Sequence, residues 1–172
     1  LNGVSEEATI MSYGFNPDLG VWSPYHMAYY SIIEAVTKLA AVGGDYRKAR
    51  LTLQEYFEKL GKNAERWGKP FAALLGAYYA QNRLGIQIDL GIPAIGGKDS
   101  MSGSFGDIDV PPTLVAFAVG VEKAKNIISA ELKEAGSQLV FLMAERNEDY
   151  LSEYLDGSGN EITAIKDSIK NR

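Results

Sequence analysis

A glycine pair followed by an ammonium, a carboxylate and two hydroxyls is the stretch of this sequence best suited to chemistry. It reads IPAIGGKDSMSGSFGD, at positions 92 to 107, and contains Lys98, Asp99, Ser100 and Ser102. Glycine carries no side chain and tolerates positive φ, so such a loop can bring backbone N–H groups close to a phosphate. Lys98 and the hydroxyls suit phosphate oxygens, and Asp99 suits Mg²⁺. The pattern predicts a loop that binds a metal-nucleotide.

The same stretch allows two other interpretations. In a purely structural one, Gly96 and Gly97 form a tight turn, Asp99 makes an Asx-turn and Lys98 is solvated. The stretch also resembles the SGGxDS loop of PP-loop ATP pyrophosphatases, but that loop opens directly into a helix. Here the sequel MSGSFGDIDVPP is too rich in glycine and proline for a helix. The residue spacing does not fit a Walker A motif either.

Composition excludes several classes of protein. The chain has 172 residues, is 46% hydrophobic and 23% charged, and carries a formal net charge of -5, which is typical of a globular protein with one real core. No cluster of lysine and arginine is dense enough to predict nucleic-acid binding. The absence of cysteine excludes a disulfide framework and a thiol nucleophile in these residues, and fits a cytoplasmic protein. No signal peptide and no run of roughly 18 apolar residues is present, so we expect no membrane segment.

Helices are predicted mainly in the first half of the chain. Residues 1 to 22 suggest a short extended piece and then a loop. Ser23 and Pro24 are typical of a helix N-cap and first turn, and that helix should end at Gly43 and Gly44. Helical spacing of apolar residues predicts a second helix from Tyr46 to Leu60 and a third from Pro70 to about Leu84, in which Ala72, Ala73 and Gly76 would let another element pack closely.

Strands are predicted mainly in the second half. IQIDL and IPAI indicate one or two short strands, and Thr113 to Val121 is apolar throughout, as expected of a strand covered on both faces. SQLVFLMA indicates another strand. Weaker helical patterns occupy three segments: Ala130 to Ala135, Glu148 to Leu155 and Ile162 to Lys170. This order of elements predicts an α/β or α+β fold with helices packed on a mixed sheet.

Four stretches, taken in order, resemble the phosphoribosylformylglycinamidine synthase family, and specifically the later of its two halves, which is built like aminoimidazole ribonucleotide synthetase. They are GVWSPYHMAYYSIIEAVTKLAAVGGDYRKARLTLQEYFEKL, WGKPFAALLGAYYAQNRLGI, IPAIGGKDSMSGSF and VPPTLVAFAVGV. The resemblance implies a partial synthetase-like N-terminal domain at 1 to 122, and a linker with the start of the following domain at 123 to 172. We expect the chain to be a fragment of a larger enzyme.

The resemblance also implies a reaction. Such enzymes use ATP to phosphorylate an amide oxygen of formylglycinamide ribonucleotide, and ammonia from glutamine then displaces the phosphate. The products are formylglycinamidine ribonucleotide, ADP, phosphate and glutamate. The family's glutaminase domain uses a cysteine, so it is expected to be a partner of these residues, together with the other domains of the enzyme. Alone, the fragment is expected to be inactive, and a half-open β-layer would favour either a homodimer of the fragment or a rearranged sheet edge.

Site residues follow from the same resemblance. It implies that Glu34 and Asp99 share Mg²⁺ at an auxiliary ATP or ADP site, with Gly97, Lys98, Ser100 and Ser102 binding the nucleotide. Many relatives carry an asparagine one turn after that glutamate, but this sequence has Lys38, whose ammonium cannot ligate a metal.

Several alternatives stay open. Glu34 and Lys38 have the spacing of a surface ion pair between successive helical turns. Lys38 also favours a second hypothesis, in which this segment is a non-catalytic structural half with a degenerate nucleotide site. Another ATP-dependent branch of the same superfamily, such as a small-molecule kinase or selenophosphate synthetase, is a third possibility. The single histidine, His26, fits a packing or capping role at the start of a helix.

Overall fold

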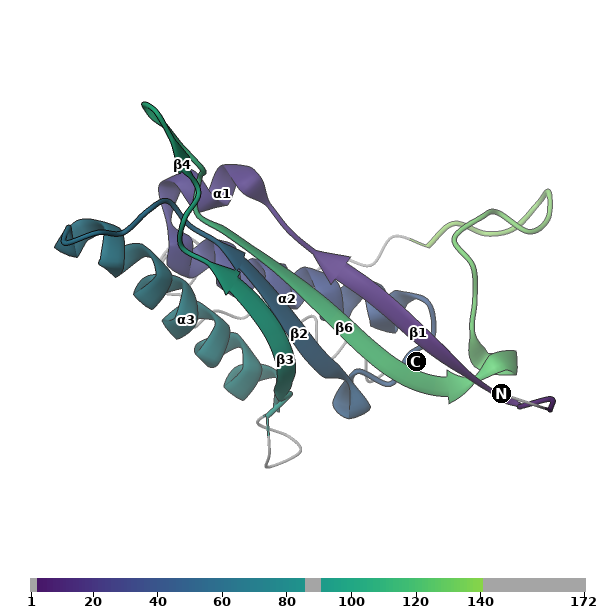
Figure 1. The fold of residues 1–172 in the computed structure, drawn as a ribbon. Coiled ribbons are helices and arrows are strands. Elements are labelled where there is room, and N and C mark those ends of the chain that lie inside the picture. Colours follow the sequence, from purple (N-terminus) through teal and green to yellow (C-terminus); the bar gives the residue numbers. More distant parts are fainter. Residues whose placement is uncertain (1–2, 86–90, 141–172) are drawn as a thin grey trace. The chain divides into compact units, whose positions relative to one another are not determined.

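The computed structural model describes residues 3–85 and 91–140 and divides the chain into two compact units, Leu1–Ile127 and Ile128–Arg172. All helices and strands of the described residues lie in the first unit (Figure 1). In the second unit the described residues 128–140 form no helix or strand, so the helix predicted at Ala130 to Ala135 is wrong. The strand SQLVFLMA is absent as far as Val140, and its remainder lies outside the described residues. The patterns at IQIDL, Glu148 to Leu155 and Ile162 to Lys170 also lie outside them.

A four-stranded mixed sheet forms the centre of the first unit. Its order is β1-β6-β2-β3: β1 (Glu7–Gly14) and β2 (Arg50–Tyr56) both pair antiparallel with β6 (Thr113–Lys123), and β2 pairs parallel with β3 (Ala94–Ser100). A separate small hairpin joins β4 (Ser104–Phe105) to β5 (Ile108–Asp109). The predicted class, helices packed on a mixed sheet, is confirmed.

Three helices accompany this sheet, and α2 (Pro24–Ala41) is the central one. It packs against β1 and β6 and also against α3 (Ala64–Gly85), while the short α1 (Pro17–Trp22) precedes it (Figure 1). Its apolar side chains meet those of one sheet face. The largest fully buried ones in this layer are Met27, Tyr29, Ile32, Val36, Leu39, Leu51 and Leu114. No helix in the described ranges is long and apolar enough to cross a bilayer.

The best-predicted element is α2. Ser23 is its N-cap, with its hydroxyl accepting a hydrogen bond from the His26 N–H at 3.3 Å, and Pro24 is its first residue. The Ser23 hydroxyl also bonds His26 Nδ1 at 2.8 Å, which confirms the capping role of the histidine. By contrast α3 begins at Ala64 rather than at Pro70, because the Asn63 side chain caps it by accepting from the Glu65 and Arg66 N–H groups.

The predicted helix from Tyr46 to Leu60 is wrong. A 3-10 turn, η1 (Tyr46–Lys48), is followed by β2, which pairs with strands on both sides. Leu51 and Leu53 point to the helix side of the sheet while Thr52 points away. This alternation is the period of a strand. Sheet pairing on both edges therefore outweighed the helical spacing of the leucines and aromatics. Residues 1 to 22 also differ from expectation, since α1 replaces the predicted loop.

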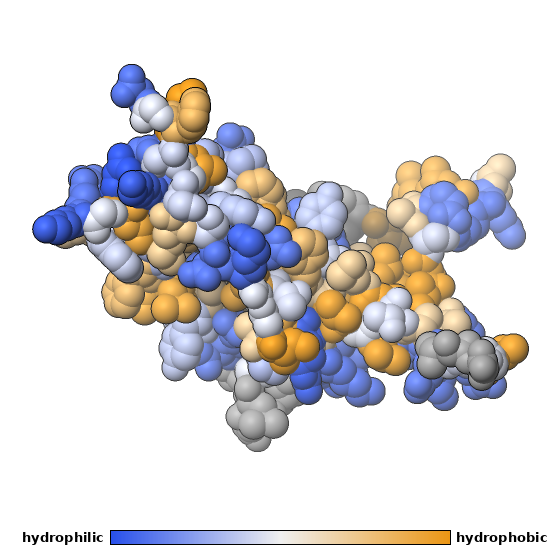
Figure 2. All heavy atoms as spheres, in the orientation of Figure 1, coloured by the Kyte–Doolittle hydropathy of each residue, from blue (hydrophilic) through white to orange (hydrophobic). Residues whose placement is uncertain are grey.

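Among the described residues only one face of β6 is covered, whereas the sequence predicted a strand covered on both faces. Its residues alternate between buried positions, such as Leu114 and Ala116, and half-exposed positions. We call the uncovered side the open face. Figure 2 shows apolar side chains gathered on the side of the sheet away from α2. By register the open face carries Thr9, Met11, Tyr13, Thr52, Gln54, Tyr56, Val115, Phe117, Val119 and Val121.

Close approach of α2 and α3 depends on Gly76. A Cβ at this position would lie 2.0 Å from the Tyr25 carbonyl oxygen, and this confirms the predicted close packing at Gly76. Gly76→Ala should therefore lower the free energy of unfolding by about 1 to 3 kcal/mol through overpacking. Urea unfolding monitored by circular dichroism measures the change.

Gly68→Ala on the same helix is the matched control. Nothing lies within 4 Å of its added Cβ, so it should stabilise the helix by up to about 1 kcal/mol through propensity alone. Equal stability of the Gly76→Ala variant and the wild type would contradict the close contact.

Candidate functional site

The GGKDS stretch is a strand rather than the predicted loop. It forms most of β3, where Gly96, Gly97, Lys98, Asp99 and Ser100 pair in register with residues 52 to 56 of β2. Gly97 lies against that neighbour, since a Cβ there would be 2.2 Å from the Leu53 carbonyl oxygen. The glycine therefore permits close strand approach, and a backbone cradle for phosphate is not formed at this point of the chain.

Strand alternation divides the polar residues between the two faces of the sheet. Lys98 and Ser100 lie on the open face, and Lys98 Nζ stands 4.9 Å from the centre of the Tyr56 ring. Ser100 and Ser102 have their hydroxyl oxygens 3.3 Å apart, just past the end of β3. Asp99 lies on the other face. The lysine and the two hydroxyls are thus available together, whereas Asp99 points the opposite way.

Asp99 stands next to Glu55 on the neighbouring parallel strand, and both lie near the carboxyl ends of their strands. Burial, followed by the charge of Asp99, raises the pKa of Glu55 above its usual value. Two adjacent carboxylates are stabilised when a cation lies between them. Sequence reasoning missed Glu55 because it assigned β2 to a helix; the Leu-Thr-Leu alternation was the signal that could have found it.

Glu34 lies at the other edge of the sheet. One of its oxygens accepts a hydrogen bond from the Phe15 N–H at 3.0 Å, and the other pairs with Lys38 Nζ at 2.6 Å. The Lys38 ammonium also stands 4.7 Å from the centre of the Tyr13 ring. Glu34 and Lys38 therefore form the ion pair that their spacing allowed. A metal ion at Glu34 would have to share the carboxylate with this lysine or displace it.

The sheet order does not bring Glu34 and Asp99 together. Glu34 contacts the end of β1, and Asp99 belongs to β3, with β6 and β2 between them. Three interstrand steps amount to about 14 Å, whereas Mg²⁺ binds oxygen at about 2.1 Å. With Glu34 held by the Phe15 N–H and Lys38 beside β1, this structure does not place the two carboxylates around a common ion. Across the described ranges, no group of three or more histidine, cysteine, aspartate and glutamate side chains is placed to hold a metal.

Comparison with solved structures supplies the fold relationship. Phosphoribosylformylglycinamidine synthase II from Thermotoga maritima superposes with a TM-score of 0.56 at 17% identity, over 73% of this chain and 19% of that chain. The T. maritima PurL complexed with ATP gives 0.58 at 16% identity, over 75% of this chain and 20% of that one. The T. maritima PurL complexed with FGAR gives a TM-score of 0.57 at 14% identity, over 76% of this chain and 18% of that chain.

No protein-family model matches the sequence, and neither does any curated protein. The chain spans about a fifth of the length of these solved enzymes. At these identities the comparison establishes the fold, and this chain has the fold of part of a PurL enzyme.

Glu55→Gln should remove a pH-dependent loss of stability. Because the folded protein holds the Glu55 proton to higher pH than the unfolded chain does, stability falls as pH rises above the ordinary pKa of 4.5. The variant should unfold at a higher urea concentration than the wild type at neutral pH, and this difference should vanish below that pKa.

Glu7→Gln, at the exposed start of β1, is the matched control and should leave the urea midpoint nearly unchanged. A wild type that is more stable than Glu55→Gln at neutral pH would contradict the unfavourable placement of this carboxylate beside Asp99.

Proposed function

We propose that this chain is part of an ATP-dependent, cytoplasmic enzyme of purine biosynthesis that acts as a phosphoribosylformylglycinamidine synthase. The observation that carries the proposal is the PurL-type fold combined with the GGKDSMS sequence, which runs from β3 into the residues directly after it. In the whole enzyme, ATP would activate the amide oxygen of formylglycinamide ribonucleotide, and ammonia from glutamine would complete the amidine as in a glutamine amidotransferase. Those steps need the domains that lie outside this chain, including a glutaminase.

The contribution proposed for this segment is an Mg²⁺-nucleotide site at the carboxyl ends of β2 and β3. Ligands of open α/β sheets commonly bind at these ends. Lys98 and Ser100 lie on one face of β3, and the Ser102 hydroxyl oxygen stands 3.3 Å from that of Ser100, just past the strand. Such groups suit the oxygens of a nucleotide phosphate.

The carboxylates at the same ends suit a divalent metal. Asp99 is exposed and Glu55 lies beside it, and their mutual repulsion would be relieved by Mg²⁺. We therefore propose Asp99, supported by Glu55, as the metal position of this site. Glu34 remains a proposed ligand only for a second ion at the β1 edge, which would have to compete with Lys38.

A structural role is the second candidate function, and the ion pair between Glu34 and Lys38 favours it. With both Glu34 oxygens engaged by the Phe15 N–H and Lys38, a metal at Glu34 would have to compete with these two contacts. In that case the segment would support a catalytic half through its helices and sheet, and its own nucleotide site would be degenerate.

The open face is the proposed contact with the rest of the enzyme or with a second copy of the chain. Met11 is 68%, Tyr13 58% and Val121 56% exposed, and they adjoin the half-exposed row of Val115, Phe117 and Val119 on β6. A continuous apolar sheet face of this kind is normally covered by a second layer.

Mg²⁺·ADP titrated into the chain by calorimetry tests the nucleotide site. We expect saturable binding that Asp99→Asn weakens by about tenfold, the equivalent of about 1.4 kcal/mol. Glu34→Gln should change the affinity by less than about threefold, well under 1 kcal/mol, because Glu34 lies three strands away.

The assembled enzyme is the control for a negative result. Absence of binding both in the isolated chain and in the assembled enzyme would contradict the nucleotide site and favour the structural role. An equal loss of affinity in Glu34→Gln and Asp99→Asn would contradict the separation of the two carboxylates.

Sedimentation equilibrium tests the proposed contact surface. Without its partner domains, the chain should dimerise through the open face, and Val119→Lys should make it monomeric because a buried lysine without a partner is costly. Lys62→Glu, in the exposed turn before α3, is the control and should stay dimeric. A monomeric wild type, or a dimer that survives Val119→Lys, would contradict this contact.

A further inference from the structure

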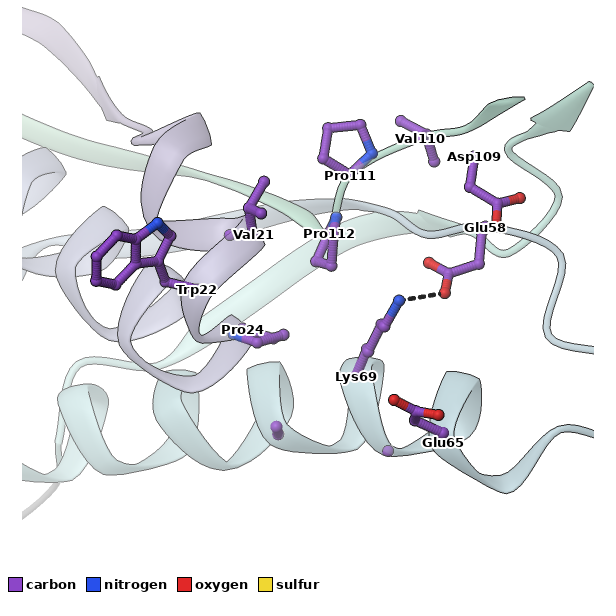
Figure 3. Close-up of a pocket in the computed structure, with 13 residues that line it drawn as sticks. Val21, Trp22, Pro24, Glu58, Glu65, Lys69, Asp109, Val110, Pro111 and Pro112 are labelled. Atoms are coloured by element: carbon purple, nitrogen blue, oxygen red, sulfur yellow. Dashed lines mark hydrogen bonds and ion pairs between the residues drawn. The ribbon is translucent and has the colours of Figure 1, made fainter. Parts of the chain in front are cut away.

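A second pocket lies away from the proposed nucleotide site, between α1, the first half of α3 and the segment from β5 to β6. It has a volume of about 470 Å³, within the range of small-molecule sites. Its walls are apolar along one side, where Trp22, Pro24 and Pro112 line it, and charged along the other (Figure 3). No sequence pattern indicates this pocket, because its residues come from four separated segments.

Glu58 is the unusual residue of this pocket. Its side chain is only 2% exposed, and Lys69 Nζ bonds its Oε1 at 2.6 Å. Its second oxygen, Oε2, is buried and accepts no hydrogen bond from any described residue. Figure 3 shows both oxygens near the Lys69 ammonium end of the pocket, with only one of them joined to the lysine. A buried carboxylate oxygen without a donor is costly, so Glu58 Oε2 is a built-in acceptor that calls for an N–H or O–H group.

The charge of the pocket lining favours a cationic ligand as the donor of this hydrogen bond. Glu58, Glu65 and Asp109 line the pocket with Lys69 as the only cation among its described lining residues. Lys69 compensates Glu58, and Arg66 compensates Asp109 at 2.6 Å. Glu65 makes no ion pair with any described residue. One negative charge among the described lining residues is thus left without an ion pair.

We propose that this pocket binds a small organic cation whose primary ammonium donates a hydrogen bond to Glu58 Oε2, while its aliphatic body lies against Trp22, Pro24 and Pro112. The Trp22 ring is 88% exposed and is free to contact the aliphatic chain or the charge itself. Glu65 supplies the remaining counter-charge. The site is separate from the residues of β3 and does not depend on the proposed nucleotide site.

Titration of n-butylammonium chloride into the ¹⁵N-labelled 172-residue chain, followed by NMR at constant ionic strength, tests the proposal. Saturable shifts are expected at the amides of Gly68, Lys69 and Glu58 and at the Trp22 indole. Tetramethylammonium has the same charge without an N–H group, so it should bind about tenfold more weakly, the effect of one hydrogen bond to a charged group. Equal binding of the two cations would overturn the role of Glu58 Oε2, and absence of saturable shifts would overturn the site.

Two variants that should change the affinity for butylammonium in opposite directions separate an effect on binding from a general loss of folding. Glu58→Gln should weaken butylammonium binding by about tenfold, but it also leaves Lys69 without a partner and could disturb the fold. Lys69→Met removes the competing ammonium, so it should tighten binding by about threefold or more, as expected for removal of a like charge nearby. Glu7→Gln, far from the pocket on β1, should have no effect. Unchanged or weaker binding in Lys69→Met would overturn the proposal.

Discussion

The whole arrangement depends on how closely the backbone of α2 approaches its neighbours. A Cβ at Gly14 would lie 2.0 Å from the Ser31 carbonyl oxygen on α2, and one at Gly76 would lie 2.0 Å from the Tyr25 carbonyl oxygen. The helix is therefore fixed against β1 on one side and against α3 on the other by contacts that admit no side chain. Because α2 packs on β1 and β6, that face of the sheet becomes the core, and the opposite face is left uncovered by the described residues.

Sheet order then decides which polar groups can cooperate. With β1 and β3 at opposite edges, Glu34 is confined to the β1 side, where the Phe15 N–H and Lys38 engage it. Asp99 instead acquires Glu55 as its neighbour through the parallel pairing of β2 with β3. The chemistry available to this segment is thus a consequence of strand pairing. Proximity along the chain misleads, since Lys98 and Asp99 are adjacent in sequence but lie on opposite faces.

The sequence predicts elements whose signals are local. Ser23 and Pro24 specify the start of α2 by capping and by a fixed φ, and the apolar run at Thr113 to Val121 specifies β6, because neither depends on distant residues. The segment from Tyr46 to Leu60 was mispredicted because its leucines fit both periods, and only pairing with β6 and β3 selects the strand. The pocket that contains Glu58 could not be predicted either, because its lining comes from segments that only the tertiary structure brings together. Candidate site residues could be named from the sequence, but the sheet face on which each one lies and the side chains beside it could not.

The central claim is that a nucleotide binds at the carboxyl ends of β2 and β3, and chemical-shift mapping of the chain with Mg²⁺·ADP tests it most directly. We expect the largest amide shifts at Glu55, Tyr56 and residues 98 to 102, with small changes at Phe15 and Glu34. Shifts concentrated at Phe15, Glu34 and Lys38 instead, or no saturable shifts at residues 98 to 102 in the assembled enzyme, would contradict it.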